Sequence, residues 1–334
     1  MKTTSHFSAL SFACWAMFAA ATGVFIPGCI RHDSDNDAQD DSAREADSHD
    51  SSLTGTTFVD LGDFVTSDAD IERWSEIRRG LDTRFNEVCG DTFCEGDYSN
   101  LESLGFTCSV SSKQGRIREC VWTFAASAES VDGASGSIAA SVPFYECRVR
   151  PTGRVRNLLR AFGEDPLSSE LPGLSGSLYD ALGDCFDHPL GEAALPAPSE
   201  GPYADVADGL EGEEIDAWYA MTSALRANFD DLCGDSFCEG DYTNLRSLRF
   251  RCSENTGTGK LGTCAWVFAG SDTSRGRRGF IQVRKQPFTC SFPVDATPGE
   301  LAAALAPGAS ETSVMFRPLP NATISINDAL IGCL

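Results

Sequence analysis

Histidine is scarce in this chain of 334 residues, with only four present. His6, His32 and His49 precede the folded regions proposed below, and His188 closes the first of them. Ser-His-Asp and Cys-His catalytic schemes therefore lack a base, and H-E-x-x-H zinc sites lack their ligands. We expect no catalytic residue of these types, and we interpret the protein as more a binding or structural protein than an enzyme.

Positive charge is also in short supply. The chain has 26 Lys and Arg against 49 Asp and Glu, which gives a formal net charge of −23. Such a surface repels phosphate backbones and anionic headgroups, so we expect no nucleic-acid partner and no polybasic docking to membranes. A G-x-G-x-x-G pattern at Gly257–Gly262 lies between two strand-like segments rather than before a helix. We interpret it as a hairpin turn and expect no nucleotide.

Long apolar runs are absent outside the amino-terminal segment. There, Lys2 precedes an uncharged run from Phe7 to Pro27 that ends in small residues. This arrangement is typical of a secretory signal peptide. The sequence therefore predicts export, which places the rest of the chain outside the cytoplasm.

The tetrapeptide Ile26-Pro27-Gly28-Cys29 resembles the lipobox of bacterial lipoproteins. The resemblance implies that Cys29 is acylated (palmitate and related chains) and becomes the first mature residue, so that the protein is anchored to a membrane. Ile30, rather than Asp, after the cysteine favours the outer membrane by the sorting logic of that family. A cleaved secretion signal and an uncleaved anchor are the alternatives.

The remainder of the chain contains an internal repeat. Phe85–Ser127 aligns with Phe229–Ser271 without gaps, and 23 of the 43 positions are identical. A segment rich in Pro, Ala and Gly separates the copies and is typical of a linker. These patterns divide the chain into a signal peptide at 1–28, an acidic disordered tether at 29–56, a first domain at 57–188, a linker at 189–204 and a second domain at 205–334.

The 14 cysteines follow the same division. Cys14 lies in the leader and Cys29 is the acylation candidate, which leaves six in each domain at matched positions. Even, matched cysteines in an exported chain predict three disulfides per domain. The pairing stays open, although the expected strand register brings Cys120 near both Cys108 and Cys147. The disulfide candidates are Cys89, Cys94, Cys108, Cys120, Cys147, Cys185, Cys233, Cys238, Cys252, Cys264, Cys290 and Cys333.

Apolar periodicity predicts an α+β fold for each copy. Residues at helical spacing from Ile71 to Val88 indicate one long helix, and matched residues indicate the same helix in the second copy. Two matched tryptophan pairs, Trp74 with Trp218 and Trp122 with Trp266, lie on apolar faces and are expected in the cores. Strand-like runs and short helical segments follow at 104–110, 120–124, 137–149, 155–162 and 177–185. We expect two tandem copies of a disulfide-stapled domain, each with one long helix packed on a small antiparallel sheet.

The two copies are most alike in Cys89–Leu101 and Cys233–Leu245, which differ only by two Thr/Ser exchanges. This block resembles the acidic, cysteine-framed loops of calcium-binding receptor modules, which implies Ca²⁺ held by oxygen atoms. The alternative is that the same residues form turns and cap backbone amides. Calcium is the one candidate cofactor, and its candidate ligands are Asp91, Glu95, Asp97, Asn100, Asp235, Glu239, Asp241 and Asn244.

The second copy also carries a local set of basic residues in an otherwise acidic protein. Arg249 and Arg251 alternate with Leu248 and Phe250, so we expect the arginines on a solvated face of the sheet. Docking of an acidic partner, including the tether of the chain itself, is the alternative. The basic set consists of Arg246, Arg249, Arg251, Arg275, Arg277, Arg278, Arg284 and Lys285.

Together these features predict an exported, lipid-anchored protein of the cell envelope. We expect a non-catalytic binding or structural module whose ligand in the envelope or outside the cell is unknown. An extracellular hydrolase that uses paired carboxylates remains an alternative, because such a mechanism needs no histidine. A secreted inhibitor of an extracellular enzyme is the third interpretation.

Overall fold

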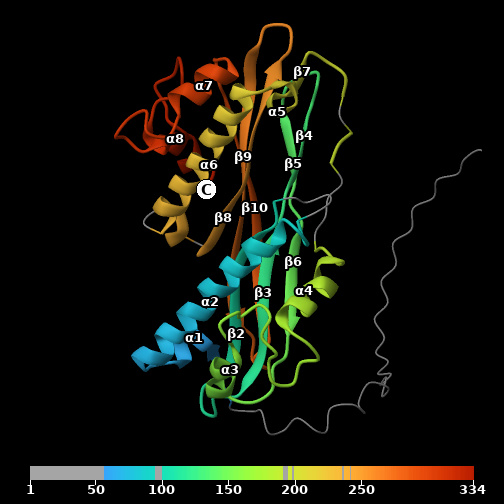
Figure 1. Cartoon of the computed structure of the whole chain (residues 1–334), viewed down its shortest axis with the longest axis vertical. Helices are drawn as coiled ribbons and strands as arrows, with labels where there is room; N and C mark the ends of the chain where they lie inside the picture. The colour runs from blue at the N-terminus through green and yellow to red at the C-terminus, as the bar shows by residue number, and fades with distance from the viewer. Residues whose placement is uncertain (1–55, 95–99, 191–194, 198, 235–236, 241) are drawn as a thin grey trace, which may run out of the picture. The chain divides into compact units, whose positions relative to one another are not determined.

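The computed structural model describes residues 56–94, 100–190, 195–197, 199–234, 237–240 and 242–334. These described residues belong to one compact unit (Figure 1). The signal peptide, the acylation candidate Cys29 and the acidic tether up to residue 55 lie outside the described residues. Among the helices of the described part, none is both long enough and apolar enough to cross a membrane.

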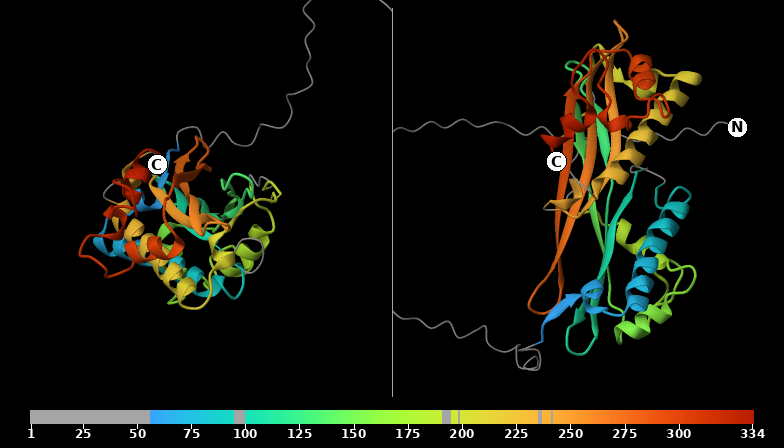
Figure 2. Two further views of the ribbon diagram at one scale, coloured as in Figure 1. Left: turned by 90° about the horizontal axis from the view of Figure 1, so that it is seen from above. Right: turned by 90° about the vertical axis from the view of Figure 1, so that its left-hand side faces the viewer.

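The first copy is built around a four-stranded antiparallel sheet with the strand order β1-β2-β3-β6, and a separate hairpin pairs β4 with β5. Its long helix α2 lies along one face of this sheet (Figure 2). The elements are β1 (Phe58–Asp60), α1 (Leu61–Phe64), α2 (Asp68–Cys89), β2 (Glu102–Ser111), β3 (Ile117–Ala125), β4 (Ala128–Val131), β5 (Ile138–Ser141), β6 (Phe144–Val149), α3 (Val155–Ala161) and α4 (Leu178–Phe186).

The second copy repeats this order, and its sheet runs β10-β9-β8-β7, again antiparallel throughout. Its strands β9 and β10 are continuous where the first copy has two shorter strands each. The elements are β7 (Tyr203–Asp205), α5 (Val206–Gly209), α6 (Glu213–Cys233), η1 (Phe237–Glu239), β8 (Asn244–Asn255), β9 (Lys260–Arg275), β10 (Ile281–Pro293), α7 (Pro298–Ala304), η2 (Val314–Phe316) and α8 (Ile326–Ile331).

The expected mixture of helices and antiparallel sheets stapled by disulfides is confirmed. The expectation of one long helix on a small sheet describes only part of each copy. Each sheet has four strands, β9 alone is 16 residues long, and shorter helices pack on each core beside the long helix.

Helix α2 begins where the sequence provides a cap. The Ser67 hydroxyl accepts a hydrogen bond from the backbone N–H of Asp70, which satisfies one of the amides that a helix start leaves unpaired. The predicted apolar face is buried at Trp74, Ile77, Leu81 and Phe85. Ile71, the first residue of that face, is 43% exposed, because it lies near the start of the helix.

All 12 cysteines of the two copies form disulfides, and the two copies use the same pairing. Cys120 pairs with Cys108, its direct neighbour on the adjacent strand, with Cα atoms 4.0 Å apart. The third bond of each copy ties the last strand of the sheet to the carboxyl-terminal helical segment. The pairs are Cys89–Cys94, Cys108–Cys120, Cys147–Cys185, Cys233–Cys238, Cys252–Cys264 and Cys290–Cys333.

A β-bulge interrupts each copy's first long strand at the same place. The register shifts between Ser103 and Gly105 in β2, and between Ser247 and Arg249 in β8. The extra residue, Leu104 or Leu248, therefore leaves its own helix-side core and packs in a cluster shared by both copies. The regular alternation expected across these residues fails at the bulge.

The two copies meet along this shared apolar cluster, which we call the seam. β4 and β5 of the first copy lie beside β7, β8 and β9 of the second, while β9 and β10 lie beside β1 and β3. The Ser253 hydroxyl donates to the backbone oxygen of Gly136 at 2.6 Å across the seam. The cluster contains Leu104, Ala125, Val142 and Phe144 from the first copy and Leu248, Val267 and Ala269 from the second.

Candidate functional site

Much of the basic set of the second copy faces acidic side chains of the first. Arg275 forms an ion pair with Asp60, and Lys285 Nζ lies 2.5 Å from Glu146 Oε1. Arg249 Nε lies 3.6 Å from Glu129 Oε2. The expectation that these three basic residues lie on a solvated face is therefore wrong. They form ion pairs with acidic residues of the first copy instead. The expectation holds for Arg277, Arg278 and Arg284, which are exposed.

Glu119 of the first copy is buried against the second copy, with a side chain that is 1% exposed. One of its oxygens, Oε1, accepts from the backbone N–H of Ile281 at 2.7 Å and from Arg148 Nη1 at 2.9 Å. The guanidinium of Arg148 also donates to the backbone oxygen of Ile281 at 3.1 Å. A charged pair in the first copy thus holds the start of β10 in the second.

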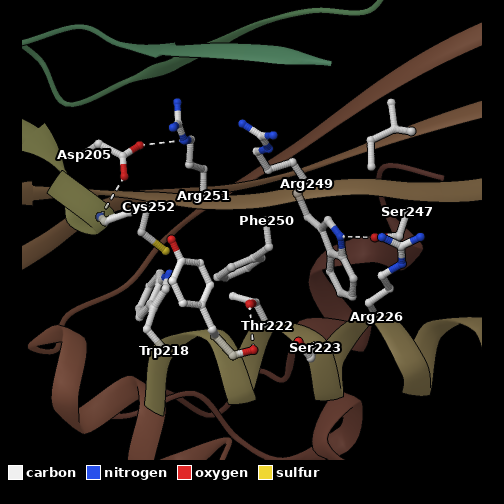
Figure 3. A pocket seen from close by; sticks show the side chains of 14 residues that line it. Asp205, Trp218, Thr222, Ser223, Arg226, Ser247, Arg249, Phe250, Arg251 and Cys252 are labelled. Carbon is white, nitrogen blue, oxygen red and sulfur yellow. Dashed lines mark hydrogen bonds and ion pairs between the residues drawn. The ribbon is translucent and has the colours of Figure 1, made fainter. Parts of the chain in front are cut away.

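A cleft of about 480 Å³ lies between helix α6 and strand β8 (Figure 3). Helix α6 contributes Tyr219, Thr222, Ser223 and Arg226, which lie on its successive turns. Strand β8 contributes six consecutive residues, Ser247–Cys252. Tyr219 is 54% exposed, which is unusual for a large aromatic residue. The cleft combines an exposed ring, hydroxyl groups and arginines, the residue types that dominate binding energy in protein interfaces.

The arginines of the cleft are held in place by acids around it. Arg226 forms an ion pair with Glu102 of the first copy through its Nη2. Arg251 places Nε 2.7 Å from Asp205 and donates from Nη1 to the backbone oxygen of Glu129 at 2.9 Å. A guanidinium carries five N–H donors, so these contacts orient each group without using all of its donors. Figure 3 shows Arg249 and Arg251 on the side of β8 away from Thr222 and Ser223.

Burial changes the acids around this cleft. It raises the pKa of Glu102, Glu129 and Asp205 above their ordinary values, although the neighbouring arginines oppose the shift. Desolvation disfavours the charged form of a carboxyl group, and here it outweighs the ion pairs. As the pH falls, the acids beside Arg226, Arg249 and Arg251 therefore lose their negative charge at a higher pH than ordinary carboxyl groups do.

The cleft also contains an open strand edge. The short strand β7 pairs with β8 only at Ser253–Asn255, after which the chain turns into α5. Among the described strands, Arg249–Cys252 therefore has a partner on one side only, which is β9. An open edge presents backbone N–H and C=O groups that another extended chain can pair with.

A counterpart cleft of about 600 Å³ lies at α2 and β2 of the first copy, and residues of the second copy, among them Asp230 and Arg246, also line it. Asp82 lines this cleft at the position that aligns with Arg226 of the second copy. The Trp122 Nε1 donates to Ser103 Oγ at 2.8 Å, and that hydroxyl donates to Asp82 Oδ1 at 2.6 Å. Burial raises the pKa of Asp82. The two clefts thus share their position in the fold but differ in charge.

The candidate calcium ligands are only partly described. Asn100 Nδ2 donates to Ser127 Oγ at 2.7 Å, and its side-chain oxygen accepts from Ser127 N at 3.0 Å, so this side chain anchors a turn. Asn244 lines the counterpart cleft, Asp91 lies in the turn after α2, and Glu239 ends η1. The remaining candidates, Glu95, Asp97, Asp235 and Asp241, lie outside the described residues.

Within the described ranges, no group of three or more His, Cys, Asp or Glu side chains is arranged to hold a metal ion. Because half of the candidate ligands lie outside those ranges, the calcium hypothesis stays a prediction. The four tryptophans of the folded copies are buried in the cores as expected. Gly257–Gly259 lies in the turn between β8 and β9, which agrees with a hairpin.

Comparisons with known proteins return no similar protein: no family model matches the chain, and no curated protein and no solved structure matches it. The functional interpretation therefore depends on the geometry of this chain.

Sequence reasoning missed Tyr219, Arg226 and Glu102. One signal could have found two of them. Aligned positions of the copies carry opposite charge at Asp82 and Arg226, and again at Glu102 and Arg246. Paired reversals of this kind indicate that the two copies face each other through those positions.

Proposed function

We propose that this protein is an exported, lipid-anchored protein of the cell envelope whose folded part is a non-catalytic binding module. The cleft between α6 and β8 is its binding site. The leader and the lipobox-like residues up to Cys29 support the anchor. The 12 cysteines in disulfides support an oxidising compartment outside the cytoplasm, since thiols are kept reduced inside it.

One observation carries the binding site. The cleft combines Arg226 and an exposed tyrosine on the helix side with Arg249 and Arg251 along an open strand edge, in a protein whose net charge is strongly negative. Catalysis is disfavoured because the described cysteines are all oxidised and the one described histidine, His188, is exposed and contacts the backbone oxygen of Asp184. Arginine and tyrosine at an open cleft favour recognition over chemistry.

The test of the site compares the wild type with an Arg226→Gln/Tyr219→Ala variant. Each chain is exported into an oxidising compartment, purified as it is processed there, labelled and applied to arrays of glycans and of short peptides. We expect at least one class of array member to bind the wild type and to lose binding in the variant. Equal binding of the two proteins to every array member would show that the cleft is not the site.

The test of the anchor uses Cys29→Ser. In a bacterial host supplied with labelled palmitate, the wild type is expected to incorporate the label and to fractionate with the outer membrane. The variant is expected to remain unlabelled. Labelling of the variant would refute acylation at Cys29, and soluble wild type in the medium would support a cleaved secretion signal.

A carboxylate hydrolase is the second candidate, favoured by Asp82. This carboxyl group lines the counterpart cleft and has a pKa raised by burial, as a general acid requires. A panel of chromogenic glycosides tests it: hydrolysis by the wild type that is lost in Asp82→Asn would establish this candidate in place of a purely binding role. A matched panel of extracellular proteases tests the inhibitor alternative.

A further inference from the structure

We propose that the cleft between α6 and β8 binds an extended peptide with acidic side chains, which adds as a strand to the open edge of β8. This inference rests on the proposed function, because it names the ligand class of that same cleft. Three features of the cleft carry it: its backbone, its charge and its exposed ring.

The backbone of β8 provides the edge. β7 occupies the neighbouring strand position at Ser253–Asn255 and leaves it when the chain turns at Val206 into α5. Beyond this point the place beside Arg249–Cys252 is not taken by β7, and these four residues of β8 line the cleft. At about 3.3 Å per residue, this stretch accommodates about 13 Å of extended chain. A peptide placed there continues the strand that β7 begins, and its amides pair with those of β8.

The charge of the cleft selects the side chains. In an extended peptide, alternate side chains point to opposite faces of the sheet. One set would face Arg249 and Arg251, and the other set would face α6, where Arg226 and the hydroxyl groups of Thr222 and Ser223 lie. Carboxylates accept charge-assisted hydrogen bonds from guanidinium groups, so acidic residues fit both faces.

The exposed ring of Tyr219 completes the cleft on the helix side. The aligned residue of the first copy is Ser75, so the ring is a feature of the second copy alone. The counterpart cleft also places Gly105 and Thr107 where the second copy has Arg249 and Arg251. The three arginines that line the counterpart cleft are balanced by three aspartates, whereas the cleft of the second copy has three arginines and one aspartate. We therefore assign the peptide site to the second copy only.

The probe is a fluorescent, acetylated and amidated heptapeptide of alternating aspartate and valine, and binding to the full chain is measured by anisotropy. We expect the aspartate peptide to bind about tenfold more tightly than the same peptide with lysine for aspartate. Two further peptides carry N-methyl groups on the odd or on the even backbone amides. Since only alternate amides of an added strand face its neighbour, we expect one of them to bind about tenfold more weakly and the other to bind as the parent does.

Three protein variants locate the site. Tyr219→Ala removes an exposed ring without disturbing the core, and we expect a several-fold loss of affinity. Arg251→Gln is expected to weaken binding about tenfold, with its melting temperature recorded because Asp205 loses an ion pair. Arg278→Gln is the matched control: it removes one positive charge at the exposed tip between β9 and β10 and should leave affinity unchanged.

Equal binding of the two N-methylated peptides would overturn strand addition, and equal binding of the lysine peptide would overturn the charge assignment. If no peptide binds but an array glycan binds in a manner that requires Arg226 and Tyr219, this inference fails and the proposed function stands. If the variants of the cleft change no binding at all, both fail.

Discussion

The seam between the copies makes a quantitative prediction at Glu119. Replacing this residue by alanine removes the acceptor of two donors, the backbone N–H of Ile281 and the guanidinium of Arg148. Arg148 retains its ion pair with Glu146 at 2.5 Å and its hydrogen bond to the backbone oxygen of Ile281, so its positive charge is still compensated. The backbone N–H of Ile281, in contrast, loses the side-chain acceptor that it has in the folded protein.

The magnitude follows from these two losses. A buried amide left without an acceptor costs about 1–3 kcal/mol, and the loss of a hydrogen bond to a charged group costs about 1.5–3 kcal/mol. We therefore expect Glu119→Ala to lower the free energy of unfolding by about 3–5 kcal/mol, the sum of these two losses. Glu119→Gln keeps one acceptor oxygen for Ile281, so it should cost about half as much.

The assay is equilibrium unfolding in urea with the disulfides intact, followed by tryptophan fluorescence. Glu76→Ala serves as the matched control, since Glu76 also pairs with an arginine, Arg73 at 3.3 Å, but on an exposed helix surface. Exposed pairs of this kind contribute about 0.3–0.5 kcal/mol. A loss below about 1 kcal/mol for Glu119→Ala, or one equal to that of Glu76→Ala, would refute the conclusion that Glu119 holds the two copies together.

Three more predictions concern the seam and the framework. Leu248→Ala is expected to cost about 2–5 kcal/mol in urea unfolding, the range for a buried leucine, whereas a cost near zero would contradict its place in the shared cluster. Replacing both cysteines of Cys147–Cys185, which closes 38 residues, should cost about 4 kcal/mol against about 2 kcal/mol for Cys89–Cys94, which closes 5, and equal losses would contradict the loop-entropy argument. Because burial raises the pKa of Glu129, its stabilising contribution is fully present below the unfolded value of about 4.3 and is lost as the pH rises through the folded value. We expect the free energy of unfolding to fall between mild acid and neutral pH by less in Glu129→Gln than in the wild type, and identical pH profiles would refute this.

The elements within each copy could be predicted from the sequence, because they depend on local periodicity. The face of α2 at Trp74, Leu81 and Phe85 and the strands that carry Cys108 and Cys120 follow from spacings of three to four and of two residues. The disulfide between those two cysteines was one of two pairings that the expected register allowed.

The seam could not be predicted in the same way. A β-bulge shifts every side chain beyond it to the other face, and nothing in the alternation around Leu104 marks the shift. The alternation with Phe250 does place Arg249 and Arg251 on the opposite side of β8, but the expectation that this side is solvated was wrong. What lies on that side, the first copy, is a long-range contact that periodicity does not encode.

The charges of the seam explain why one copy cannot replace the other. The first copy has acids at Asp82 and Glu102, and the second copy has arginines at the aligned positions Arg226 and Arg246. Two first copies packed in this way would bring acid against acid, and two second copies would bring arginine against arginine, so like-charge repulsion specifies the mixed pair. Asp82 and Arg226 also line the two aligned clefts, so the same charge difference makes the clefts unlike each other. The duplication therefore does not give the chain two equal binding sites. An acidic ligand that fits beside Arg226 in the second copy would meet the carboxyl group of Asp82 at the aligned position of the first copy.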